Sequence, residues 1–123
     1  MSDLSAIAAI STPLGTGGVG IIRISGKNAT EIVDRIFISV NGKNLASSKG
    51  YRAYFGKIYD GNTAVDEVIC LVFRAPHSYT GEDVVEINCH GGVFLLKKIL
   101  RLVLSNGAIA ASPGEFTKRA FLN

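Results

Sequence analysis

Two strand-like runs joined by a short glycine turn constrain the fold of this chain more than any other feature. Residues 51–59 and 65–73 are rich in β-branched and aromatic side chains, and Asp60-Gly61-Asn62 separates them. A short turn containing glycine is typical of a β-hairpin, in which two neighbouring strands pair antiparallel. The sequence therefore predicts a core that is built on a sheet with antiparallel strands.

Strand and helix patterns alternate along the rest of the chain. β-forming runs at residues 6–10, 19–25 and 83–89 predict three more strands. Apolar side chains recur with a helical period over residues 29–37 and 93–104, which predicts two helices. This order of elements predicts an α+β fold, with a mixed or antiparallel sheet packed with helices.

A last helix is expected to start at Ser112-Pro113-Gly114-Glu115. Serine is a preferred N-cap, proline suits the first helical position, and a glutamate three residues after the cap can bond back to it. The sequence stops at Asn123, soon after this signal. We therefore expect residues 1–123 to be a single domain, whose C-terminal end starts a helix that is cut off by truncation.

The composition excludes several classes of protein. With 123 residues, 47% of them hydrophobic and 19% charged, the chain can bury one core and is not disordered. No apolar run approaches the roughly 20 residues of a membrane-spanning helix, so we expect no membrane association. Two cysteines cannot form a disulfide framework and no secretory signal opens the chain, which favours a cytoplasmic location. The net charge of +3 is too small to indicate nucleic-acid binding by itself.

A glycine-rich segment matches the sequence of a dinucleotide-binding fingerprint but lacks the helix that should follow it. Residues 15–20 read Gly-Thr-Gly-Gly-Val-Gly and follow a predicted strand. The true fingerprint opens a helix whose N-terminus holds a pyrophosphate, whereas residues 19–24 are β-formers here. We interpret the segment as a connection between two strands. The phosphate-binding motif G-x-x-x-x-G-K-[ST] is absent, so no nucleotide hydrolysis is expected from this chain alone.

A single charge interrupts the second predicted strand. Alternate residues of a strand face the same side, so Arg23 shares a face with Val19 and Ile21. A guanidinium in an apolar strand is costly unless it is paired or lies at a rim. Two interpretations remain open, a salt bridge at the edge of the sheet and a clamp for an anionic ligand.

The strand predicted at residues 83–89 repeats this pattern. Glu86, Asn88 and His90 fall on one face and Gly91-Gly92 follows them. This row of polar groups is either a binding site or a solvated face. Cys89 lies next to His90, but neighbouring strand residues point to opposite faces and cannot act as a nucleophile and its base. Cys89 is therefore interpreted as a buried core residue, and two His with two Cys make a poor zinc site.

Three segments of the chain resemble the signatures of one family. They read STPLG and GIIRISG within residues 11–26, RAPHSYTGEDVVEINCHGG at 74–92, and PGEFTKRAFLN at 113–123. Together, and in this order, they resemble the opening of the tRNA modification GTPases of the MnmE (TrmE) family. The resemblance covers essentially the whole chain.

The resemblance implies an N-terminal domain that dimerises and binds a one-carbon folate, either 5-formyl- or 5,10-methylene-tetrahydrofolate. Family folate contacts fall on an arginine and a glutamate that match Arg23 and Glu86. A carboxylate suits the adjacent donors of the pterin edge, and a guanidinium suits the anionic tail of folate. We therefore expect Glu86 to hold the pterin and Arg23 an anionic or carbonyl group, with Asn88 and His90 as helpers. A third family contact, a lysine, would lie after Asn123.

The resemblance also implies that the parent protein is longer. In the family, a helical domain and a G domain follow the segment seen here, and the G domain hydrolyses GTP with potassium and magnesium. The family protein works with the FAD enzyme MnmG on the wobble uridine of certain tRNAs. No catalytic residue and no metal ligand is expected among residues 1–123.

A homodimerisation module without a ligand role is the alternative interpretation. The helix predicted at residues 93–104 is apolar around most of its girth, and Phe94 falls inside its polar stripe. This excess of apolar surface favours an interface with a second copy of the chain. A homodimer is expected under both interpretations.

Overall fold

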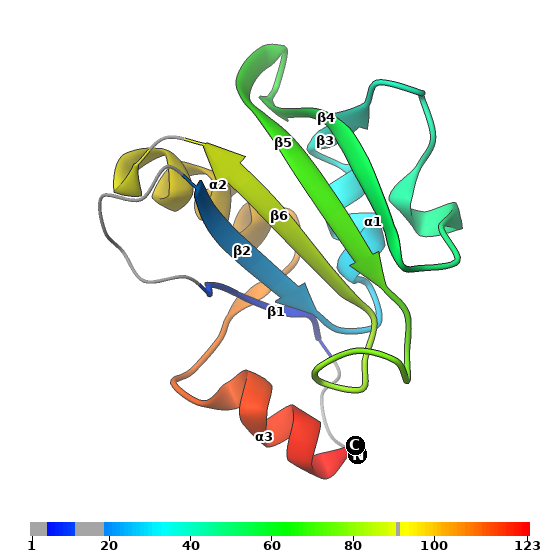
Figure 1. Cartoon of the computed structure of the whole chain (residues 1–123). Coiled ribbons are helices and arrows are strands. Elements are labelled where there is room, and N and C mark those ends of the chain that lie inside the picture. The colour runs from blue at the N-terminus through cyan, green and yellow to red at the C-terminus, as the bar shows by residue number, and fades with distance from the viewer. Residues whose placement is uncertain (1–4, 12–18, 91) are drawn as a thin grey trace.

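A mixed sheet of seven strands organises the computed structural model, which describes residues 5–11, 19–90 and 92–123 (Figure 1). The strands follow one another across the sheet in the order β3-β4-β5-β6-β2-β1-β7. Only β1 and β7 pair in parallel among the described strands, and every other pair is antiparallel. The strands are β1 Ile7–Ile10, β2 Val19–Ser25, β3 Phe37–Ser39, β4 Arg52–Asp60, β5 Thr63–Phe73, β6 Val84–His90 and β7 Ile109–Ala110. The predicted α+β fold with a mixed sheet is confirmed.

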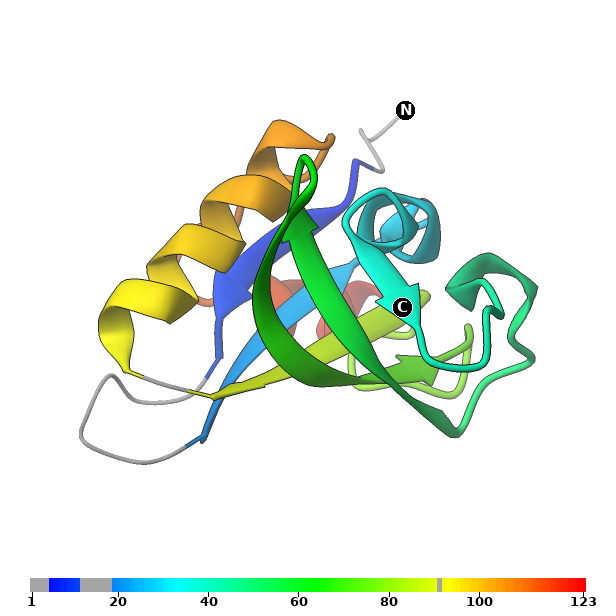
Figure 2. The ribbon, with the colours of Figure 1, turned by 90° about the horizontal axis from the view of Figure 1, so that it is seen from above.

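Two helices cover one face of this sheet. α1 (Ala29–Asp34) and α2 (Val93–Ser105) lie on the same side of the strands, and Figure 2 shows the twisted sheet with both helices above it. The core lies between these helices and the sheet, and it includes Ile22, Ile24 and Ile87, which are all fully buried. The opposite face of β2, β4, β5 and β6 is not covered by α1 or α2, and we call it the open face. α3 (Glu115–Leu122) lies beyond one end of the strands (Figure 1).

The predicted hairpin is confirmed as β4 and β5. Their pairing runs to Asp60 opposite Thr63, so Gly61 and Asn62 form the turn. Gly61 has a φ of +61°, the left-handed region that glycine adopts without steric cost. The turn sets the pairing at the tip of the hairpin, and a bulge between Ile58 and Tyr59 shifts the register by one residue along the rest of the two strands.

The first predicted helix ends earlier than its apolar spacing indicated. α1 stops at Asp34, and Phe37, predicted as helical, begins the edge strand β3 opposite Ile58. Phe37 is buried in the same core as the helix. Its apolar side chain therefore continued the helical spacing in the sequence, although the residue belongs to a strand. Gly56 permits the close pairing, because an added Cβ there would collide with the carbonyl oxygen of Ile38.

The start of the last helix also differs from the prediction. Ser112 is not the N-cap, since α3 begins at Glu115 after Gly114, which has a φ of +76°. Half of the predicted capping interaction forms nevertheless, because Oε1 of Glu115 accepts the N–H of Ser112 at 2.8 Å. The glycine turns the chain into the helix, so the helix begins later than the proline suggested.

The helix α2 buries a narrower face than predicted. Leu96, Ile99 and Val103 are buried, whereas the leucines beside them are only partly buried against the core. Phe94 is 79% exposed. In the part of the chain that the structure describes, no helix is long and apolar enough to span a membrane.

Candidate ligand-binding site

The pairing of β2 with β6 places the two predicted site residues opposite each other. Arg23 and Glu86 are register partners, and Nε of Arg23 donates to Oε2 of Glu86 at 3.0 Å. Both side chains are partly buried. The predicted alternation is also found, since Ile22 and Ile24 point into the core while Arg23 lies on the open face. The salt bridge expected for Arg23 is found, but it lies between two interior strands and not at the edge of the sheet, and the carboxylate fixes the guanidinium.

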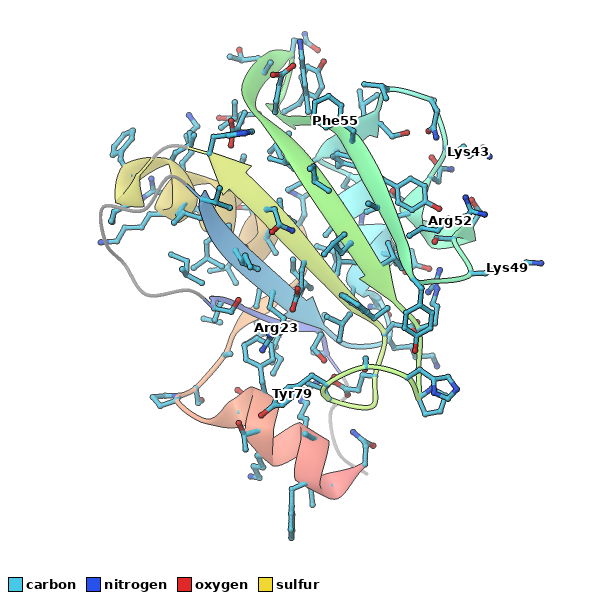
Figure 3. The ribbon with its side chains drawn as sticks, in the orientation of Figure 1. Arg23, Lys43, Lys49, Arg52, Phe55 and Tyr79 are labelled. Atoms are coloured by element: carbon cyan, nitrogen blue, oxygen red, sulfur yellow. The ribbon has the colours of Figure 1, made fainter. Side chains whose placement is uncertain are left out.

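Two aromatic rings flank the same guanidinium. The Cζ atom of Arg23 lies 5.3 Å from the ring centre of Tyr79 and 5.5 Å from that of Phe116. Both distances are in the range of cation–π contacts. Tyr79 comes from the loop between β5 and β6, and Phe116 comes from α3; Figure 3 shows Arg23 and Tyr79 together above this helix. The strand and helix patterns of the sequence identified neither ring.

A hollow of about 400 Å³ opens beside this cluster. Its volume falls within the range of small-molecule sites. The wall combines the guanidinium, the two rings, the end of β1 and the turn before α3; its lining residues are Ala9, Ile10, Ser11, Arg23, Tyr79, Ala111, Ser112, Pro113, Gly114, Phe116 and Thr117. Glu86 is not part of this lining and meets it through Arg23.

A polar network fixes α3 at this position. Nη1 of Arg119 lies 3.1 Å and 3.2 Å from the two carboxylate oxygens of Glu82, which precedes β6. Glu82 also accepts from the hydroxyl of Ser25 at 2.8 Å, and that hydroxyl lies 2.7 Å from the hydroxyl of Thr80. Ser25 and Thr80 are fully buried. The network therefore ties α3 to the end of β2 and holds Phe116 beside Arg23.

The predicted helpers lie apart from the hollow. Asn88 donates to the carbonyl oxygen of Ile69 at 3.3 Å, and Nδ1 of His90 lies 2.7 Å from the carbonyl oxygen of Glu67. Both line a different, mostly apolar hollow of about 450 Å³ on the open face. The structure thus groups Arg23 with Glu86, and places Asn88 and His90 with β5.

The structure places Cys89 in the core. It is fully buried, while His90 is exposed on the opposite face of the strand. Burial, reinforced by the nearby Asp66, raises the pKa of the Cys89 thiol to about 12. Burial likewise raises the pKa of Cys70. No cluster of metal-ligating side chains occurs within residues 5–11, 19–90 and 92–123.

Both thiols should resist alkylation in the folded protein. The thiolate is the reactive form, and a raised pKa together with full burial removes it at pH 8. Iodoacetamide at pH 8 should leave Cys70 and Cys89 unmodified in the native chain and modify both in strong denaturant, as measured by intact mass. Rapid modification of Cys89 in the native chain would instead show that this thiol is reactive and is not only a core residue.

Comparison with known proteins shows the family of this chain. A family model described as GTP-binding protein TrmE N-terminus matches residues 6–123. A "tRNA modification GTPase MnmE" from Chlorobaculum tepidum is 55% identical over 118 residues, covering 95% of this chain and 25% of the relative. Proteins of the same name from Carboxydothermus hydrogenoformans and Geobacillus kaustophilus are 56% and 52% identical, over 95% and 100% of this chain and 26% and 27% of their own lengths.

The chain therefore spans about a quarter of the length of these relatives. The match runs through every strand and helix of the structure, including the loop that carries Tyr79 and the helix that carries Phe116. With this match, the chain belongs to the TrmE N-terminal family.

Proposed function

We propose that this chain binds a reduced one-carbon folate in the hollow beside Arg23. One observation carries the proposal: the guanidinium is held by Glu86 from the neighbouring strand and flanked by two aromatic rings, at the wall of a hollow of about 400 Å³. Charged groups fixed in this way are preorganised for a polar ligand, so little order is lost on binding.

The chemistry of the cluster suits the parts of a tetrahydrofolate. The adjacent N–H donors of a pterin match a carboxylate, and each carboxylate oxygen has two lone pairs. Glu86 lies just outside the lining of the hollow, and it can accept from a pterin edge that extends past the guanidinium while it keeps its bond to Arg23. Tyr79 and Phe116 offer apolar ring faces against which a flat heterocycle packs. Arg23 would meet the folate's anionic tail or a carbonyl oxygen.

The whole protein is proposed to be a tRNA modification GTPase, as its relatives are named. GTP, potassium and magnesium would then act outside these 123 residues, whose sequence has no G-x-x-x-x-G-K-[ST] motif. MnmG and tRNA would be partners of the whole protein, and a cytoplasmic location belongs to the same proposal. The role of this chain would be to hold the one-carbon donor.

Thermal unfolding with and without ligand tests the folate proposal. A ligand that binds only the folded state increases the free energy of unfolding by RT ln(1 + [L]/Kd), which raises the melting temperature. 5-Formyl-tetrahydrofolate and 5,10-methylene-tetrahydrofolate should each raise the melting temperature, whereas GTP should not. No shift at saturating concentrations of either folate would leave the alternative, a dimerisation module without a ligand.

Dimerisation is the second part of the proposed function, and the open face supports it. Val19, Phe55 and Ile69 are large apolar side chains that this face exposes on β2, β4 and β5. Val19 and Ile69 also line the apolar hollow of about 450 Å³. Contiguous apolar surface of this kind marks interaction sites. A second copy would cover it, which is a different surface from the helix α2 that the sequence favoured.

Replacing Ile69 by lysine should convert the homodimer to a monomer. The substitution places a charge at the centre of the proposed interface, where the desolvation of an unpaired ammonium opposes association. Analytical ultracentrifugation at tens of micromolar should show a dimer for the wild type and a monomer for Ile69→Lys. Phe94→Ser on α2 is the control and should remain dimeric. A monomeric wild type, or monomerisation by Phe94→Ser alone, would contradict this assignment.

A further inference from the structure

A polar hollow of about 550 Å³ lies beside the start of β4, before the residues that pair with β3, and β5 and β6 separate it from β2. It is lined by the turn after β3, the short 3-10 helix η1 (Leu45–Ser47) and the start of β4. Three exposed cations stand around it, Lys43, Lys49 and Arg52. Figure 3 shows all three on one side of the molecule. We call this the basic hollow.

The charge of the basic hollow is not neutralised by neighbouring acids. None of its three cations forms a salt bridge among the described residues, although Arg23, Arg74, Lys98 and Arg119 all do. The carboxylate of Asp34, which lies against this loop, is already engaged. Its two oxygens accept the N–H groups of Leu45 at 2.8 Å and Ala46 at 2.9 Å.

The backbone that carries these cations is fixed by other hydrogen bonds. The guanidinium of Arg74 donates to the carbonyl oxygens of Ser48 at 2.8 Å and Ala46 at 2.7 Å. Oδ1 of Asn41 accepts the N–H of Lys43 at 3.0 Å. A loop held from both sides in this way loses little further order when an anion binds.

We propose that the basic hollow binds the phosphate backbone of an RNA. Lys43, Lys49 and Arg52 supply the charge that phosphate contacts use, whereas the hydroxyl of Ser47 already donates to the carbonyl oxygen of Asn44 at 3.1 Å. The lining offers no exposed aromatic ring on which a base could stack, so the contacts fix position and do not read sequence. The choice of RNA among polyanions rests on the proposed function, in which the whole protein acts on tRNA.

Salt dependence of RNA binding tests this proposal. Neutralising three phosphates gives a slope of about −2.7 in log K against log salt, so raising KCl from 50 to 200 mM should weaken binding roughly 40-fold. A fluorescently labelled RNA hairpin and anisotropy measure this for the chain. The triple variant Lys43→Gln, Lys49→Gln, Arg52→Gln should bind more weakly at 50 mM and should lose most of this salt dependence.

A matched control separates a local site from the overall charge of the chain. The triple variant Lys97→Gln, Arg101→Gln, Lys118→Gln removes the same number of charges from α2 and α3. It should keep the affinity and the salt dependence of the wild type. Equal losses in the two triple variants, or no loss in the first, would overturn the proposal. So would binding of the wild type to phosphatidylserine vesicles in the absence of any RNA binding.

The folate and RNA proposals can fail separately. The basic hollow uses none of the residues around Arg23, so its triple variant should keep the wild-type shift in melting temperature with 5-formyl-tetrahydrofolate. Loss of that shift in the triple variant would show that the substitutions disturb the fold. In that case single variants at the same three positions decide the question, and the proposal requires each of them to lower the salt slope by about 1. A folate shift without any RNA binding refutes the basic hollow alone.

Discussion

Replacing Glu86 by glutamine should weaken the binding of 5-formyl-tetrahydrofolate about 30- to 150-fold. The substitution keeps the shape of the side chain but turns one acceptor into a donor that faces the pterin donors. It also removes the charge that holds Arg23 at 3.0 Å. The loss of a charged, paired hydrogen bond costs about 2–3 kcal/mol, which corresponds to this range of affinity.

Variants at two arginines provide the comparison for the effect of Glu86→Gln on folate affinity. Arg23→Ala should weaken folate binding by a similar factor, since it removes both the ligand contact and the partner of Glu86. Arg101→Ala, on the exposed side of α2, should change the affinity little. Titration calorimetry on all three variants gives the comparison, once each has the melting temperature of the wild type. Equal affinities for Glu86→Gln and the wild type would reject the assignment of Glu86.

Replacing Arg119 by alanine should lower the free energy of unfolding by about 2–3 kcal/mol. Arg119 and Glu82 are each only 14% exposed, and the guanidinium contacts both carboxylate oxygens. Its removal leaves a largely buried carboxylate with the hydroxyl of Ser25 as its remaining partner, and unpaired buried charges carry costs of this size. Urea denaturation measures the change.

Lys118→Ala is the control for Arg119, because it removes a neighbouring exposed cation from the same helix. It should change the stability by less than about 0.5 kcal/mol. Arg119→Ala should also weaken folate binding, since α3 would no longer hold Phe116 beside Arg23. An Arg119→Ala variant as stable as the wild type would show that α3 is fixed by other contacts.

The strands and the faces of their residues could be predicted from the sequence. A period of two needs only the local pattern, so alternation alone separates Arg23 and Glu86 from the core-facing isoleucines and valines beside them. The pairing between Arg23 and Glu86 could not be predicted. It depends on β6 lying next to β2 in a register that brings these two residues together, and nothing in either segment specifies that neighbour.

The aromatic part of the site was missed for a different reason. Tyr79 lies in a loop and Phe116 at the start of the last helix, and neither has a periodic pattern around it. Phe116 meets Arg23 because α3 is tied to this loop, by Arg119 to Glu82 and by the hydroxyl of Thr117, which lies 2.9 Å from that of Tyr79. A charged pair between a loop and a distant helix has no signal in a single sequence. Burial caused the opposite error at Phe37, where a strand residue completed a helical spacing.

The central claim is that the hollow beside Arg23 and Glu86 binds a reduced folate. Calorimetric titration of 5-formyl-tetrahydrofolate into this chain tests it most directly. We expect a saturable isotherm with one folate per chain, which Glu86→Gln weakens by at least about 30-fold and which the Lys43, Lys49 and Arg52 triple variant leaves unchanged. Absence of saturable binding to the folded wild type would contradict it.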